Sequence, residues 1–471
     1  MRAFIPPEIL SLIFMHALPT CCADRELGPD SSPILLTLVS RYWRAVAQST
    51  PRLWVDLYLP DVPRTVQDID PFFTAIQNWL SYSGSQPISL TLTSEEWDKN
   101  ILARYLSILC AHSGRWKSIS FDFRIVDPII FPVLNRQTMP FLESFSYQTH
   151  DPEVTVAHTD AISPSAWTVW DSLSWAPRLH TIRLVHPIST LLLTPSPSIT
   201  TIDIKIVTTL DPITVDLAHF LLCVGSCPNL EFLRISYEGE EEDIVLLTTG
   251  VTQIRLPNLR TLSLFIDQAP YLFKALLDSI LAPNLQRFEI AASESNRELY
   301  DSLGDFILRV SPTLRSFDSS GKLLNDADLA EACQRLSHLT SLSAWDYMVA
   351  ENSFIKALRL HFHPDGRLRF GQNTNLKDLN IYVAGSWSGF GCTFAEYYMQ
   401  ILEAVQSRWR LPVGAKDYDG NELERMREVK FAGWSEYRIR QEAPVAYAML
   451  IRFRMEGLVV KFSSDWNEEA Y

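Results

Sequence analysis

Two histidines separated by one residue offer the spacing in this chain that best suits a metal site. His361 and His363 would point to the same side of a strand, where both imidazoles could reach one zinc ion. No nearby set of cysteine, aspartate or histidine completes the ligands that zinc requires. Cys223 and Cys227 lie at helical spacing in an apolar segment, where buried thiols pack as small hydrophobic side chains. We therefore expect no metal and no cofactor.

Glycines and carboxylates are the other residues that could serve catalysis. The stretch from Gly385 to Gly391 has no phosphate-loop lysine and lacks the Gly-x-Ser-x-Gly order of a nucleophile elbow. The acidic run from Glu238 to Asp243 favours a solvated loop tip over a contact with a basic partner. With 55 acidic residues in the chain, no pair can be singled out as general acid and base. We expect a protein that is not an enzyme.

Charge and composition exclude further classes. The net charge of −14 disfavours general attraction to nucleic acid or anionic membranes. No apolar run approaches the roughly 20 residues of a membrane-spanning helix, and the N-terminus lacks the pattern of a signal peptide. Seven cysteines, an odd number, argue against a disulfide framework. We expect a cytoplasmic or nuclear protein with no nucleic-acid or membrane partner.

Three short helices are predicted at the N-terminus. Pro6, Pro7 and Glu8 suit the first turn of a helix. Ser32 is a candidate N-cap of a second helix, and Trp43 belongs to a third. In the first helix, apolar residues cover most of the circumference: Ile9, Leu10, Leu12, Ile13 and Phe14. Some forty residues cannot bury this much apolar surface alone, so a neighbouring domain or a partner should cover it.

The same residues carry a family resemblance. Ile5-Pro6-x-Glu8-Ile9, followed by Leu38-Val39-Ser40-Arg41-x-Trp43-Arg44, resembles an F-box, and Ser49 to Trp54 resembles the version common in large fungal F-box families. The resemblance implies binding to a Skp-type adaptor and, through it, to a cullin. It also implies which residues form or support the adaptor interface: Ile5, Pro6, Ile9, Ile13, Leu36, Val39 and Trp43.

A phrase of proline, a polar residue, leucine, two further residues and alternating apolar residues recurs beyond Trp54. Clear copies begin at Pro177, Pro228, Pro257 and Pro283. Weaker copies begin at Trp116, Leu142, Ile199, Leu314, Leu339 and Leu376. Each phrase predicts a short strand, and apolar residues at helical spacing predict helices around these groups: Leu217 to Val224, Leu272 to Ile280, Leu299 to Leu308, and Leu329 to Leu336.

This period resembles that of leucine-rich repeats, because the leucines at 230, 259, 285, 314 and 339 recur every 25 to 29 residues. The asparagine typical of that family is replaced in the four clear copies by Pro187, Glu238, Asp267 and Ser293. We therefore expect an irregular α/β solenoid with a parallel inner sheet. A doubly wound sheet is the rival fold, but no glycine-rich phosphate-binding turn follows a predicted strand.

These patterns predict a domain order. The F-box spans residues 1–54, the leucine-rich-repeat-like solenoid residues 55–410, and a capping segment residues 411–471. Within the cap, Val429 to Phe431, Val445 to Phe453 and Leu458 to Phe462 are predicted as strands or a short helix that cover the last repeat.

A candidate target surface follows from the solenoid. Residues beside the buried strand positions would line the concave face, and the arginine and aromatic ones suit an interface: Arg183, Arg234, Phe265, Trp345 and Tyr382. Ordinary half-packed strand residues are an equally good interpretation of each. The resulting hypothesis is a substrate receptor of a Skp-cullin-F-box ubiquitin ligase that binds a protein target. The alternative is a non-catalytic repeat scaffold that binds the adaptor or other proteins outside any ligase.

Overall fold

The structure is a computed structural model that describes most of the chain. The described residues are 5–19, 32–59, 69–94, 99–123, 138–149, 176–186, 196–207, 213–239, 244–247, 252–266, 269–292, 297–321, 324, 326–346, 353–383, 393–433 and 435–463. The chain divides into two compact units. The first unit comprises residues 1–230 and 242–250, and the second comprises residues 231–241 and 251–471. The predicted domain boundaries near residues 54 and 410 stay predictions.

The first unit begins with helices and continues into a parallel sheet. Its helical elements are α1 (Pro7–Ala17), α2 (Ile34–Val39), α3 (Arg41–Gln48), η2 (Pro51–Trp54), α4 (Ile69–Tyr82), α5 (Lys99–Cys110), η4 (Ser113–Arg115) and α9 (Leu217–Gly225). Strands β1 (Asp56–Leu59), β2 (Ile88–Ser94), β3 (Trp116–Phe123), β4 (Ser144–Thr149), β5 (Thr181–His186) and β6 (Thr201–Val207) pair in that order, all parallel. A separate parallel pair joins β7 (Ile213–Asp216) and β9 (Ile244–Leu247).

The second unit repeats strand and helix through its length. The strands of its sheet, in order, are β8 (Phe232–Glu238), β11 (Thr261–Ile266), β13 (Arg287–Ala292), β14 (Ser316–Gly321), β15 (Ser341–Asp346), β18 (Asp378–Val383), β19 (Glu428–Ala432) and β20 (Val459–Ser463). All neighbouring pairs in this series are parallel. Short pairs join β10 (Ile254–Arg255) to β12 (Ile280–Leu281) and β16 (His361–Phe362) to β17 (Leu368–Phe370).

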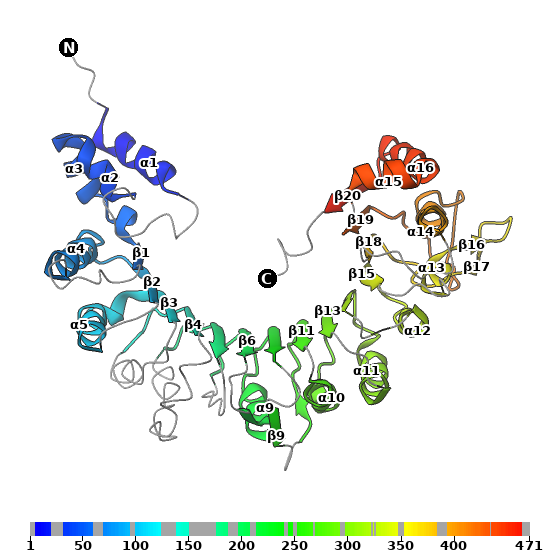
Figure 1. Cartoon of the computed structure of the whole chain (residues 1–471), viewed down its shortest axis with the longest axis horizontal. Coiled ribbons are helices and arrows are strands. Elements are labelled where there is room, and N and C mark those ends of the chain that lie inside the picture. Colours follow the sequence, from blue (N-terminus) through cyan, green and yellow to red (C-terminus); the bar gives the residue numbers. More distant parts are fainter. Residues whose placement is uncertain are drawn as a thin grey trace. The chain divides into compact units, whose positions relative to one another are not determined.

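The helices of the second unit follow its strands. They are α10 (Pro270–Ser279), α11 (Arg297–Val310), α12 (Asp326–Arg335), α13 (Ser353–Leu358), α14 (Phe394–Trp409), α15 (Glu436–Glu442) and α16 (Pro444–Met455). Figure 1 shows α10 to α14 on one side of the strands. The predicted α/β class with parallel strands is confirmed. The segment from Val445 to Phe453 is helical and lies within α16, while Val429 to Phe431 and most of Leu458 to Phe462 lie in strands.

The recurring phrase starts strands through one local turn. Leu259 N–H donates to the Leu256 carbonyl, and the equivalent bond joins Leu285 to Ala282 and Leu339 to Leu336. Each anchoring leucine is fully buried, and its strand begins two residues later. A residue that is both turn donor and core side chain fixes the direction in which the chain enters the sheet. The phrase did not predict β1 and β2. Pro51-Arg52-Leu53 precedes β1, but the alternating Leu57 and Leu59 lie one position later than in the clear copies, and no Pro-x-Leu precedes β2.

Side chains just before the anchors join successive repeats. Asn284 Nδ2 donates to the Pro257 carbonyl at 2.8 Å, and Thr313 Oγ1 donates to the Pro283 carbonyl at 3.2 Å. In the first unit, Asn229 Nδ2 donates to the Pro197 carbonyl at 2.7 Å. These donors bond turn carbonyls of the preceding repeat, which gives the polar residue of the phrase a structural role.

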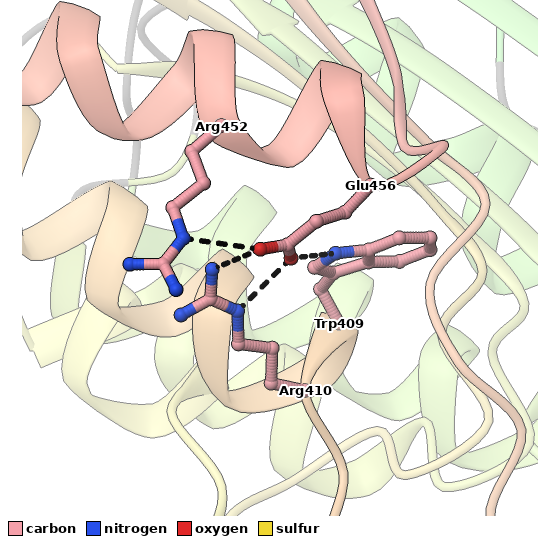
Figure 2. Close-up of polar contacts among 4 residues, drawn as sticks. All are labelled: Trp409, Arg410, Arg452 and Glu456. Atoms are coloured by element: carbon pink, nitrogen blue, oxygen red, sulfur yellow. Dashed lines mark hydrogen bonds and ion pairs between the residues drawn. The ribbon is translucent and has the colours of Figure 1, made fainter.

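Two groups of hydrogen bonds, one made by Arg408 and one by Glu456, stabilise the last repeats. Arg408 is 1% exposed and donates to the carbonyls of Leu358, Gln372 and Asn373. Burial lowers the pKa of the Arg408 guanidinium to about 9. At the end of α14, the Glu456 carboxylate accepts hydrogen bonds from Trp409, Arg410 and Arg452 (Figure 2). These bonds join the end of α14 to α16.

Candidate protein-interaction surfaces

Helix α1 is apolar on both its buried side and an exposed side. Leu10 and Phe14 are 1% and 0% exposed, and the Phe14 ring lies 4.9 Å from the Trp43 ring of α3. On the other side, Ile9 and Ile13 are 49% and 46% exposed. Pro6 occupies the N-cap and Glu8 the first turn, so the helix begins where the sequence predicts.

Helices α2 and α3 meet at a sharp corner. Ser40 caps α3, because its hydroxyl accepts from the Trp43 N–H at 3.1 Å. Arg44 Nε donates to the Thr37 carbonyl at 3.0 Å and holds the two helices together. The prediction of Ser32 as N-cap of the second helix is wrong, because Pro33 occupies that position and no side chain caps the helix. The helix begins at Ile34, one residue later than a Ser32 cap would require, and proline has no side-chain acceptor for its first N–H groups.

The motif after α3 anchors this corner to helix α4. Trp54 Nε1 donates to the Ala47 carbonyl at 2.8 Å, and Trp79 Nε1 of α4 donates to the Trp54 carbonyl at 3.0 Å. The two indoles meet edge to face at 5.0 Å. Tyr42 Oη donates to the Ile5 carbonyl at 2.6 Å and fixes the segment before α1. The predicted closing motif therefore orients the three helices on the rest of the first unit.

The exposed apolar side chains of α1 and α2, together with Ile5 two residues before α1, form what we call the N-terminal apolar patch. Its members are between 44% and 58% exposed: Ile5, Ile9, Leu12, Ile13, Leu35, Leu38 and Val39. They recur at helical spacing on each helix, so each helix presents one apolar side to solvent. Covering each half-exposed side chain contributes about 1 kcal/mol to association. This surface can bind an apolar partner and holds no group suited to chemistry.

The predicted adaptor residues fall into two groups. Ile5, Ile9, Ile13 and Val39 belong to the patch, and Pro6 is exposed beside them. Leu36 is only 9% exposed, and Trp43 is half-buried against Phe14, so these two can only support the surface from beneath. Prediction from the sequence missed Leu12, Leu35 and Leu38 as interface candidates. The helical spacing of the leucines in Ile34 to Val39 was the signal that could have found the last two.

A second surface lies on the sheet of the second unit. One side chain from each strand forms a row across it, which we call the polar row: Arg234, Ser263, Glu289, Asp318, Ser343, Asn380, Lys430 and Lys461. The residues on either side of this row along each strand are mostly buried core. Because strand side chains alternate, the polar row lies on the face opposite those core residues, which we call the polar face.

The predicted target residues are distributed over both units. Arg234 and Phe265 come together on adjacent strands, with the guanidinium 5.3 Å from the ring centroid. Trp345 and Tyr382 are register partners on β15 and β18. Arg183 lies on β5 of the first unit, where its Nε is 3.4 Å from Asp203 Oδ2. The sequence therefore identified two neighbouring pairs on the second unit and one separate arginine.

The residues considered above as metal ligands or catalytic groups are exposed, buried in the core, or outside the described residues. His361 and His363 are exposed on a short hairpin, and no group of three or more potential metal ligands occurs among the described residues. Cys223 and Cys227 are buried thiols, as packing predicts, and burial raises the pKa of Cys227. The stretch from Gly385 to Gly391 and most of the acidic run after Glu238 lie outside the described residues, as do Pro187, Asp267 and Ser293.

Comparisons with known proteins give no identity. No protein-family model matches the chain, and a search of curated proteins found no relative. In the part of the chain that the structure describes, no helix combines the length and apolarity needed to cross a membrane.

Proposed function

We propose that this chain is an F-box substrate receptor of a Skp-cullin-F-box ubiquitin ligase. In this proposal, α1 to α3 bind the Skp-type adaptor through the N-terminal apolar patch, and the polar face of the second unit holds a protein target. The repeats form an irregular leucine-rich-repeat-like solenoid. Strands that each pair in parallel with the next repeat support this assignment.

The observation that carries the proposal is the two-sided apolarity of α1. Leu10 and Phe14 already fill the core of the helical corner, yet Ile9, Leu12 and Ile13 remain about half exposed. A helix that is apolar around its circumference is stable in water only when its second side is also covered. The residues from Ile5 to Ile9 and from Leu38 to Arg44 resemble an F-box, and this resemblance makes the adaptor the proposed partner for the exposed side of α1.

The mechanism in this proposal is proximity. The adaptor and cullin hold the ubiquitin-loaded enzyme near the target, so the effective concentration of target lysines rises without a catalytic group from this chain. The working location is the cytoplasm or nucleus, where that assembly is found.

A binding experiment with purified adaptor tests the proposal. We expect the intact chain to retain a Skp-type adaptor in a pull-down and an Ile9→Asp/Leu38→Asp variant to lose it, because each carboxylate would be buried in an apolar interface. Leu308→Asp is a matched control, since Leu308 is 50% exposed on α11 of the second unit. Equal adaptor binding by the patch variant and the control would refute the proposal.

Recruitment of the cullin separates the receptor from a scaffold. A complex of chain and adaptor that also binds the cullin supports the ligase function. Adaptor binding that excludes the cullin would favour the non-catalytic scaffold instead. Circular dichroism spectra should first show that the patch variant and the Leu308→Asp control remain folded.

A further inference from the structure

Strand β20 is the last strand of the sheet in the second unit, and among the described strands it pairs with β19 alone (Figure 1). Val459 N–H donates to the Arg427 carbonyl at 3.1 Å, and Gly433 N–H donates to the Ser463 carbonyl at 3.0 Å. In a parallel pair, alternate residues of a strand bond to the same neighbour. Every second residue from Val459 to Ser463 therefore bonds to β19, and the residues between them direct their backbone groups away from it.

The outward backbone groups of β20 belong to Val460 and Phe462, and one of the four has a partner. Arg454 Nη2 of α16 donates to the Val460 carbonyl at 3.1 Å. The Val460 N–H and both the N–H and the carbonyl of Phe462 have no hydrogen-bond partner among the described residues. A row of open backbone groups at a sheet edge can pair with an extended peptide, which then becomes one more strand.

The core side of β20 offers an aromatic surface to such a strand. Phe462 is half-buried, and its ring stacks on the buried Phe431 ring at a centroid distance of 5.7 Å. The Arg454 guanidinium lies 5.0 Å from the Phe462 ring. Since side chains of neighbouring strands lie beside one another, an apolar residue of an added strand would cover the open side of Phe462.

The polar side of β20 offers a positive charge. The Lys461 side chain is 57% exposed, and its register partner on β19 is Lys430. Glu428 contacts Lys461 Nζ at 2.8 Å, so these two lysines have one carboxylate beside them on the last two strands. No acidic residue occurs in Val459–Ser463. A carboxylate on an added strand would therefore meet a cation and no acid of β20.

This charge also argues against a second copy of the chain as the occupant. Two copies of β20, paired antiparallel through their outward groups, would place Val460 opposite Phe462 and Lys461 opposite its own equivalent. Like charges directly opposite each other destabilise a strand pair, and an edge lysine opposes pairing between identical edges. The edge of β20 thus favours a different chain with an acidic residue at that position.

We propose that the free edge of β20 binds an extended segment of a partner protein in which acidic and apolar residues alternate. The backbone groups of Val460 and Phe462 hold the segment as an added strand, with its carboxylate beside Lys461 and its apolar side chains on the Phe462 side. The inference goes beyond adaptor binding and does not depend on it, because β20 belongs to the second unit and the N-terminal apolar patch to the first.

A random dodecapeptide library displayed on phage and panned against the intact chain tests this edge. We expect the selected peptides to share an acidic residue flanked by apolar ones. N-methylation of alternate backbone amides in a synthetic peptide from this set should weaken binding about tenfold or more in one phase, because a methylated nitrogen cannot donate to β20. Methylation in the other phase, where the amides point away from β20, should change binding little.

Two protein variants at one position provide the matched control. Val460→Pro removes an outward N–H without removing a bond to β19, and Val460→Ala keeps that N–H. Val460→Pro should therefore bind the peptide about tenfold more weakly than Val460→Ala. Lys461→Glu should also weaken binding, and a peptide with lysine in place of its acidic residue should restore it.

Several results would overturn the inference. These are selected peptides without the alternating pattern, no selected peptide, equal effects of methylation in both phases, or equal binding by Val460→Pro and Val460→Ala. A dimer of the intact chain in sedimentation that Val460→Pro abolishes would identify a second copy as the occupant instead. The methylation series needs no protein variant, so it decides the question if Val460→Pro does not fold.

Discussion

The N-terminal apolar patch and the polar face differ in the kind of side chain that they offer to a partner. Ile9 and its neighbours on the patch are apolar and about half exposed, and they form no polar contacts through their side chains. The polar face instead has charged and amide groups, among them Glu289, which is ion-paired with Arg287, and Asp318, which is hydrogen-bonded to Ser343. Apolar burial gives affinity with little dependence on direction, whereas buried polar groups penalise an imperfect partner. In the proposed receptor, the first surface suits one constant partner and the second a selected one.

The largest expected effect contrasts the two sides of α1. Phe14→Ala should lower the free energy of unfolding by about 3–5 kcal/mol, because it removes a fully buried ring that packs on Trp43. Ile13→Ala should cost under about 1 kcal/mol, because that side chain is already half exposed. Urea unfolding followed by tryptophan fluorescence measures both. Equal losses would mean that the patch belongs to the folded core.

The patch itself should matter for binding and little for stability. Ile9→Asp/Leu38→Asp should weaken adaptor binding by about 100-fold or more, with a change in unfolding free energy below about 1 kcal/mol. Calorimetric titration with the purified adaptor measures the first quantity and urea unfolding the second. Normal adaptor binding by this variant would show that the patch is not the binding surface.

At neutral pH the buried Asp318 carboxylate on the polar face should destabilise the folded state. The pKa of Asp318 is raised from 3.8 to about 6, so the folded state holds this proton more tightly than the unfolded state. Stability from this group is complete below pH 3.8 and is lost as the pH rises through 6. Asp318→Asn should therefore raise the unfolding free energy by about 1–3 kcal/mol at pH 7.5 and by almost nothing at pH 4. Urea unfolding at both pH values measures the difference, and a pH-independent effect would contradict it.

The bonds between repeats hold the polar face in register and should have a smaller effect. Asn284→Ala should cost about 1 kcal/mol, since it removes the donor to the Pro257 carbonyl. Asn284→Thr should be nearly neutral, because Thr313 makes the equivalent bond in the next repeat. Thermal unfolding of the two variants distinguishes this bond from a general effect of the position.

The smallest expected effect concerns Glu456, whose pKa is lowered to about 2, first by the hydrogen bond from Arg410. A lowered carboxyl pKa stabilises the folded state above the ordinary value of 4.5, and this is lost as the pH falls toward 2. Glu456→Gln should lower the melting temperature slightly at pH 7, and the difference from the parent should narrow as the pH is lowered from 5 to 3. This trend is opposite to that of Asp318. A difference that widens in acid would show that the charge of Glu456 is not what stabilises the end of α14.

The sequence by itself determined the elements that depend on short-range patterns. The anchoring leucines predicted where strands of the main sheets begin, because one residue provides both the turn hydrogen bond and the core side chain. Helices around Leu272 and Leu299 followed from their spacing. Ser32 is not the cap because the helix begins one residue later, at Ile34. Strand β1 was missed because its alternating leucines are shifted by one position from Pro51-Arg52-Leu53, and β2 because no Pro-x-Leu precedes it.

Only the tertiary structure decided which side chains remain open. In Leu35-Leu36, burial differs between adjacent leucines because α3 covers one side of α2, and no local pattern reports that. Glu289 and Asp318 lie 29 positions apart, and the strand register alone makes them neighbours. The sequence specifies local geometry through turns and helical spacing, whereas exposure and charge compensation arise from contacts between distant segments.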